Sequence, residues 1–72
     1  MTALELLRIA AAGELRVAVS LNDYWLACAL ETEGLLVHVR SEGTARWTEF
    51  VVWTITGKGR VNLAHMEAGG AT

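Results

Sequence analysis

The sequence has a single cysteine, Cys28, so an intramolecular disulfide is excluded and this chain alone cannot build a zinc site from cysteines. A reducing cytoplasm suits such a chain best. No apolar run approaches the ~18 residues needed to cross a bilayer, and residues 1–5 lack the basic start of a signal peptide. We therefore expect a soluble, cytoplasmic protein with no membrane partner.

Motifs for catalysis, and for binding a metal or a cofactor, are also lacking. His38 and His65 stand outside any metal or nucleophile motif, and the neighbours of Cys28 do not favour a reactive thiolate. Glu31 and Glu33 point to different sides of their expected helix and resemble solvated charges more than an acid–base pair. We expect no enzyme activity, no cofactor and no metal, with Cys28 as a small buried apolar side chain.

A strong basic field is absent as well. The formal net charge is −2, which argues against strong indiscriminate binding to nucleic acid. The charges are unevenly spread, because residues 1–33 hold two arginines against five carboxylates, whereas residues 34–60 hold four basic residues against two carboxylates. The basic part of the chain is therefore its second half.

The length and the apolar content suggest one small domain with an interface. A chain of 72 residues forms a core whose packing alone gives only about 3–5 kcal/mol of net stability. The apolar share of 53% and the three tryptophans exceed what one copy can hide. We expect a single domain over residues 1–68, a disordered tail at residues 69–72, and a second copy or another protein as partner.

The first helix is expected over residues 2–12, from a capping box of Thr2 and Glu5 to a stop at Gly13. Its inward stripe is made of apolar residues at helical spacing, namely Leu4, Leu7 and Ala11. Residues 14–19 alternate polar and apolar side chains, which indicates an extended segment that pairs beside a hairpin. A short helical turn is the alternative.

A second helix is expected over residues 21–33, with Ser20 and Asp23 at capping-box spacing. Its inward face should contain Leu26, Ala27 and Leu30, and its outer face Asn22, Trp25, Ala29 and Thr32. Gly34 can adopt the left-handed conformation that ends a helix.

Two β-rich runs, residues 35–40 and 47–56, flank a polar segment at residues 41–44 that predicts a hairpin turn. Large apolar side chains stand on both faces of the second run, so part of it should be covered on both sides. Thr56 can cap a last helix over residues 57–68. One side of that helix would contain Val61, Ala64, His65 and Ala68.

Two runs in the second half resemble the winged-helix transcription regulators. They consist of Leu30, Glu31, Gly34, Leu35 and Leu36, and of Trp53, Ile55, Thr56 and Gly59. Similar runs end the last core helix and the second wing strand in that family. The resemblance implies an α+β fold, a minimal winged helix with helices packed on a small antiparallel hairpin sheet, phage-like in its compactness. It also implies a shortened or missing middle helix and a buried Trp53.

By the same resemblance, the protein would be a small DNA-binding transcriptional regulator, a dimer that contacts double-stranded DNA mainly through the wing. Arg40 and Arg46 flank the wing tip, and the last helix begins with Lys58 and Arg60. The recognition helix offers only Asn22 to a base edge, and no arginine or lysine to guanine. The candidate DNA contacts are Asn22, Trp25, Arg40, Arg46, Lys58 and Arg60.

The alternative is a protein-interaction or inhibitor module that keeps the fold and does not bind DNA. Trp25 would project from a largely neutral helix face, and exposed aromatic residues of this kind anchor protein interfaces. We expect Trp25 to be at least partly exposed in a single copy, and Trp53 and Leu30 to be core residues.

Overall fold

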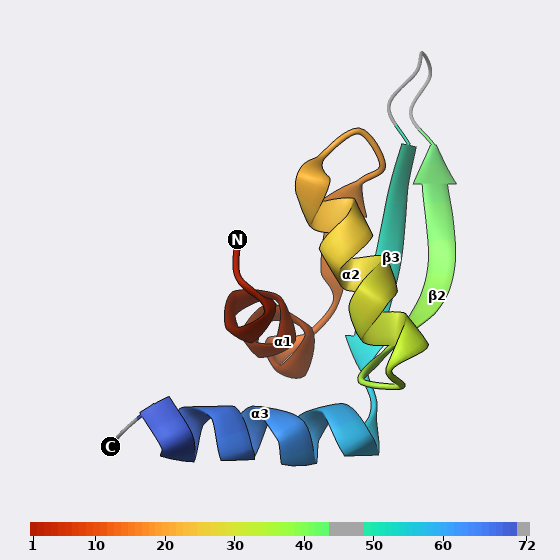
Figure 1. Cartoon of the computed structure of the whole chain (residues 1–72). Helices are drawn as coiled ribbons and strands as arrows, with labels where there is room; N and C mark the ends of the chain where they lie inside the picture. The colour runs from red at the N-terminus through yellow and green to blue at the C-terminus, as the bar shows by residue number, and fades with distance from the viewer. Residues whose placement is uncertain (44–48, 71–72) are drawn as a thin grey trace.

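The computed structural model describes residues 1–43 and 49–70. The elements follow one another as α1 (Ala3–Ala12), β1 (Leu15–Ala18), α2 (Asn22–Thr32), β2 (Leu36–Gly43), β3 (Glu49–Ile55) and α3 (Gly57–Gly70). Figure 1 shows β2 and β3 as a long hairpin, with α2 lying along it, α1 beside α2, and α3 across the end of the hairpin away from its tip. The predicted α+β class, with helices packed on a small antiparallel sheet, is confirmed.

The sheet has the strand order β1-β3-β2, and both pairings are antiparallel. Residues 15–18 pair with β3, so the extended interpretation is confirmed and the helical turn is wrong. The predicted turn at residues 41–44 is wrong for Ser41, Glu42 and Gly43, because they pair with Val51, Phe50 and Glu49 and so prolong β2. Thr44, and Trp47 and Thr48 of the expected second strand, lie outside the described residues.

Helix α1 begins as predicted but packs on a rotated face. The backbone N–H of Glu5 donates to Thr2 Oγ1 at 3.2 Å and the backbone N–H of Thr2 donates to Glu5 Oε1 at 2.9 Å, which confirms the capping box. The expected stripe is wrong in part: Leu4 and Ala11 are only half-buried. The fully buried residues are Leu6, Leu7 and Ala10. Helix α1 contacts β3, α2 and α3, and partners on several sides shift the buried stripe.

Helix α2 starts without the predicted cap and ends as predicted. Its N-cap residue is Leu21, with no side-chain hydrogen bond, so the capping box of Ser20 and Asp23 is wrong. Asp23 accepts instead from the amino group of Met1 at 2.9 Å. At the other end, Gly34 has φ 80° and a Schellman motif forms. Its two bonds run from Gly34 N–H to Glu31 C=O and from Leu35 N–H to Leu30 C=O, both 2.9 Å.

Only residues 19–21 separate β1 from α2. They form a tight turn in which the N–H of Leu21 donates to the C=O of Ala18 at 3.0 Å. The short connection leaves no room for a second helix. We expected a middle helix that is shortened or missing, and it is missing, because no helix lies between α1 and α2.

Helix α3 is capped as predicted and is longer than predicted. The N–H of Gly59 donates to Thr56 Oγ1 at 2.9 Å. The helix continues through Gly69 and Gly70, so these two residues are not the disordered tail that was expected, and Ala71 and Thr72 lie outside the described residues. Contact with α1 explains the extension: Leu63 is buried in the shared core, and Arg8 of α1 pairs with Glu67 at 2.9 Å. The side with Val61, Ala64, His65 and Ala68 is exposed.

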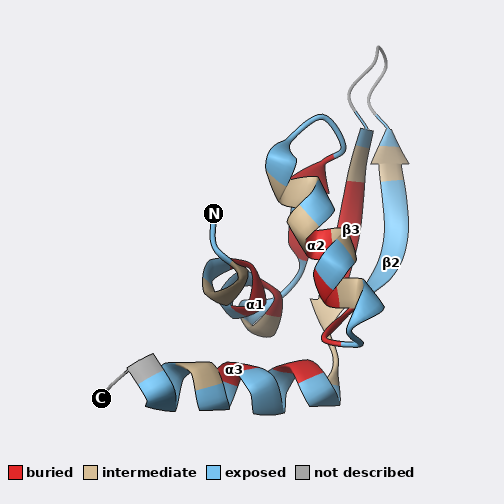
Figure 2. Ribbon diagram, in the orientation of Figure 1, coloured by how far each residue is buried: buried red, intermediate tan, exposed pale blue. Residues whose placement is uncertain are grey.

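The core lies between the three helices and the near side of the sheet, which we call the inner face (Figure 2). Trp53 is 1% exposed and Leu30 4%, so both predicted core residues are confirmed. Val52 is also buried and points to the opposite, outer face, where Arg16 and Arg40 flank it in register. The expectation that β3 is covered on both sides is therefore confirmed.

Candidate functional site

The outer side of α2 presents a surface that we call the Trp25 face, made of Leu21, Asn22, Trp25, Ala29 and Thr32. All five are exposed, which confirms the predicted outer face of Asn22, Trp25, Ala29 and Thr32. Trp25 is 70% exposed and Leu21 52%, and they are neighbours because they are four positions apart on the helix. The indole ring of Trp25 meets the ring of Tyr24 edge-on, with centroids 5.4 Å apart. An exposed tryptophan held in this way is a typical anchor of protein interfaces.

The charges around the Trp25 face are few and largely compensated. Helix α2 contains no arginine or lysine. Asp23, two positions before Trp25 in the sequence, pairs with the Met1 amino group at 2.9 Å, and this hydrogen bond raises the pKa of the amino group. The Trp25 face therefore suits an apolar contact better than a phosphate.

Arg40, a predicted wing contact, lies on the outer face of the sheet within an ion-pair network. Its two terminal nitrogens donate to the carboxylate of Glu14 at 2.8 Å each, and its Nε donates to Glu42 at 3.0 Å. Glu42 also pairs with Arg16 at 2.9 Å. The hydrogen bonds between Arg40 and Glu14 raise the pKa of Arg40 and lower that of Glu14. Two arginines and two carboxylates cancel here, and Arg46 lies outside the described residues.

Lys58 and Arg60 are the basic residues at the start of α3, and both are exposed. Neither forms an ion pair with another described residue. Gly59, between them, is buried, and a Cβ at this position would collide with the carbonyl oxygen of Leu35. The Lys58 side chain passes close to Gly34, at the C-terminus of α2, where the helix dipole favours a cation.

The structure does not bring the predicted DNA contacts together. Asn22 and Trp25 lie in the first turn of α2, whereas Lys58 lies beside its last turn. Arg40 is on the outer face of the sheet, and the helices pack on the inner one. The described candidates therefore divide into the apolar Trp25 face and a separate pair of cations, Lys58 and Arg60.

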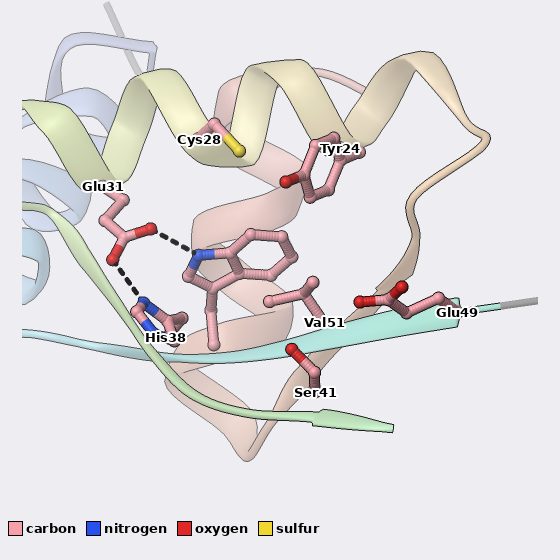
Figure 3. A pocket seen from close by; sticks show the side chains of 8 residues that line it. Tyr24, Cys28, Glu31, His38, Ser41, Glu49 and Val51 are labelled. Atoms are coloured by element: carbon pink, nitrogen blue, oxygen red, sulfur yellow. Dashed lines mark hydrogen bonds and ion pairs between the residues drawn. The ribbon is translucent and has the colours of Figure 1, made fainter. Parts of the chain in front are cut away.

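Sequence analysis missed a hollow of about 280 Å³ between α2 and the inner face of the hairpin (Figure 3). We call it the α2–hairpin pocket. Its polar and aromatic walls come from α2, β2 and β3, and they include Tyr24, Glu31, His38, Ser41, Glu49 and Trp53. Cys28 also lines the pocket and is half-buried, not fully buried as expected. The neighbouring thiol of Cys28 raises the pKa of Tyr24.

Glu31 joins two other pocket residues. Its Oε1 accepts from the indole N–H of Trp53 at 3.2 Å, and its Oε2 lies 2.8 Å from Nδ1 of His38. The hydrogen bond to His38 lowers the pKa of Glu31. The interpretation of Glu31 as a solvated charge is therefore wrong. The available signal was Trp53, because a buried indole N–H requires an acceptor.

No family model matches this chain, and no curated protein or solved structure matches it. Within residues 1–43 and 49–70, no three histidine, cysteine, aspartate or glutamate side chains are placed to hold a metal ion. The same residues contain no helix with the length and apolar character needed to span a membrane. Among the described residues, the Trp25 face, the exposed Lys58 and Arg60 at the start of α3, and the α2–hairpin pocket are candidates for a function.

Proposed function

We propose that this protein is a small protein-interaction module of the winged-helix type that self-associates through the Trp25 face. The observation that carries the proposal is Trp25 itself, 70% exposed on a helix without a basic residue. A helix that reads DNA has little use for a large apolar side chain on its outer side, whereas an interface uses it as an anchor. A cytoplasmic location is part of the proposal, because the free thiol of Cys28 suits a reducing compartment.

The winged-helix assignment is supported by the order of the elements. One helix, a short strand, a second helix and a two-stranded hairpin follow one another, and the short strand pairs with the second strand of the hairpin. The two family-like runs occupy their expected places: Gly34 ends α2 and Thr56 caps α3. In this fold α2 stands at the position of the recognition helix, and its exposed side is the Trp25 face.

A second copy of the chain is the partner that the surroundings of Trp25 favour. In a two-fold dimer each side chain near the axis meets its own equivalent, so an unpaired charge there would repel itself. The ion pair between Asp23 and Met1 removes that repulsion. A stable dimer buries roughly 800 Å² per copy, and exposed Met1 and Val19 are the apolar side chains that extend the surface around Leu21 and Trp25.

The test is sedimentation of the wild type and of Trp25→Ala over a range of concentrations. We expect a concentration-dependent dimer for the wild type and a loss of about 2 kcal/mol or more for the variant, about 30-fold in dissociation constant. Val61→Ala is the matched control, because Val61 is an exposed apolar residue of α3 outside the Trp25 face. A wild type that stays monomeric at millimolar concentration would contradict the proposal. A Trp25→Ala variant that dimerises normally but melts far lower would do the same.

DNA binding is the second candidate, favoured by Lys58 and Arg60. Both are exposed and without ion pairs to described residues, so they can neutralise phosphates. Because Arg40 is held by ion pairs with Glu14 and Glu42, we expect the contact with DNA phosphates at the start of α3 and not at Arg40 of the wing. Fluorescence anisotropy with a labelled duplex at low salt tests it. Replacing Lys58 and Arg60 by alanine should reduce the slope of log K against log salt by about two, with Arg8→Ala as a control, and a wild type that binds no duplex would remove this candidate.

A further inference from the structure

The α2–hairpin pocket has aromatic walls on the side of α2 and at its floor. The rings of Tyr24 and Trp53 lie 5.9 Å apart and are tilted by 52°. Figure 3 shows the Tyr24 ring hanging from α2 over the strands, and Trp53 belongs to β3. The face of an aromatic ring carries partial negative charge and attracts cations. Trp53 is 1% exposed, so the half-buried Tyr24, supported by Trp53, provides the ring face on which an organic cation can lie.

Two carboxylates, Glu31 and Glu49, also line the pocket, and no lysine or arginine among residues 1–43 and 49–70 lines it. Glu31 is fixed by Trp53 and His38. Glu49 makes no side-chain hydrogen bond or ion pair with another described residue, and Figure 3 shows its carboxylate beside Val51, across the pocket from Glu31. Among the described residues, the pocket thus has one carboxylate that is held in position and a second that pairs with none of them and can take a ligand.

We propose that the α2–hairpin pocket binds a small organic cation, an ammonium or guanidinium group on a short alkyl chain. The cationic head pairs with Glu49 and lies against the Tyr24 ring, and the alkyl chain lies against Val51. Ser41 at the β2 wall offers a hydroxyl to a remaining N–H. The volume of about 280 Å³ is just below the roughly 300–1,000 Å³ of drug-sized sites, so the ligand is small.

The cation site does not depend on self-association. Of the residues of the Trp25 face, none lines the pocket, although Trp25 contacts the ring of Tyr24 and Thr32 donates a hydrogen bond to the carbonyl of Cys28. Failure of the dimer and failure of the cation site are therefore separate results.

The experiment is an NMR titration of the full chain, followed through the indole N–H of Trp53, because this group donates to Glu31 inside the pocket. The probes are n-butylammonium, its neutral counterpart n-butanol and its anionic counterpart butyrate. We expect saturable shifts with butylammonium at a dissociation constant on the order of 1–10 mM, as suits so few ligand atoms. The alcohol and the carboxylate should bind at least about tenfold more weakly. Equal binding of butylammonium and butanol would overturn the proposal.

A pair of variants separates the site from the general charge of the protein. Glu49→Gln should weaken butylammonium binding about fivefold. Glu33→Gln changes the net charge equally and lies outside the pocket, so it should leave binding unchanged. Equal effects of the two substitutions would overturn the assignment. Should Glu49→Gln melt early, Tyr24→Leu removes the ring instead and must also weaken binding.

The same cation can be free in solution or carried on a protein as a lysine side chain. Acetyl-lysine methylamide, in which only the side-chain amine is charged, distinguishes the two sources. Binding tighter than that of butylammonium indicates a lysine of a partner, and weaker binding indicates a free amine. Both results support a cation site. If neither butylammonium nor acetyl-lysine methylamide binds, the cation site is overturned.

Discussion

Two regions of the molecule use tryptophan in opposite ways. On the inner face of the sheet, Trp53 is 1% exposed and its indole N–H is accepted by Glu31. On the outer side of α2, Trp25 is 70% exposed and makes no indole hydrogen bond with a described residue. The first side chain stabilises the fold and has nothing left to offer a partner. The second contributes little to the fold and is fully available, so stability and interaction should be separable by mutation.

The largest effect is expected from Trp53→Ala, which tests whether the buried tryptophan stabilises the fold. Removing a buried tryptophan leaves a cavity and should lower the free energy of unfolding by about 3–5 kcal/mol, which equals the whole net stability of a core of this size. We expect an unfolded chain by circular dichroism at 25 °C. A variant that melts close to the wild type would show that Trp53 is not the centre of the core.

The next largest effect is expected at Gly59. Gly59→Ala places a Cβ against the carbonyl oxygen of Leu35, so α3 and the start of β2 must move apart at a cost of about 1–3 kcal/mol. Gly57→Ala is the matched control, because its Cβ meets nothing within 4 Å and alanine favours the helix. Thermal melts should therefore shift downwards for Gly59→Ala and not for Gly57→Ala. Equal shifts in melting temperature would indicate that the contact between Gly59 and Leu35 rearranges easily to make room for a methyl group.

A smaller effect concerns the hydrogen bond that anchors Trp53. The pKa of Glu31 in the folded chain lies below the ordinary value of 4.5, so its contribution is complete above about pH 4.5 and is lost as the pH falls through the folded-state pKa. Glu31→Gln keeps an acceptor for the indole but does not titrate, and should flatten the fall in stability below pH 4.5.

The flattening should be partial, because the pKa values of Glu5 and Glu14 are lowered too. Denaturant unfolding between pH 3 and pH 7 measures it, with Glu33→Gln as the control. If both variants give the same profile, Glu31 does not contribute to stability through its charge.

The smallest expected effect completes the comparison. Trp25→Ala, measured at a concentration where the chain is monomeric, should change the free energy of unfolding by about 0.5 kcal/mol or less, as for most exposed positions. Chemical denaturation at micromolar concentration provides the measurement. A loss comparable to that of Trp53→Ala would mean that Trp25 belongs to the core after all, and the contrast between the two tryptophans would disappear.

The features that could be predicted from the sequence are those set by residues close together in the chain. Thr2 and Glu5 are three positions apart and form their capping box. Gly34 ends α2 through bonds within the same turn, and Thr56 caps α3 within three residues. Each signal depends on a local backbone geometry that needs no knowledge of the rest of the fold.

The features that could not be predicted depend on distant partners. Asp23 looked like part of a helix cap but is paired with Met1, and Glu31 looked solvated but joins His38 and Trp53. Arg40 looked available for a phosphate until the fold brought Glu14 beside it. Charged side chains choose partners according to tertiary geometry, so a candidate site made of charges was the part least accessible to sequence reasoning.

The register shift of β2 between His38 and Arg40 determines which face of the sheet the β2 side chains on either side of it occupy. Two residues apart on a regular strand, these side chains would share a face. Because Val39 is one residue in excess, His38 pairs with Trp53 on the inner face while Arg40 pairs with Val52 on the outer one. Deletion of Val39 would make His38 and Arg40 consecutive, and consecutive side chains alternate faces on a regular strand, so His38 would stay beside Glu31 and Arg40 beside Glu14. The extra residue instead adds a local bend and twist to β2. This hairpin should therefore tolerate deletion of Val39 as well as its substitution, the cost being the loss of that bend.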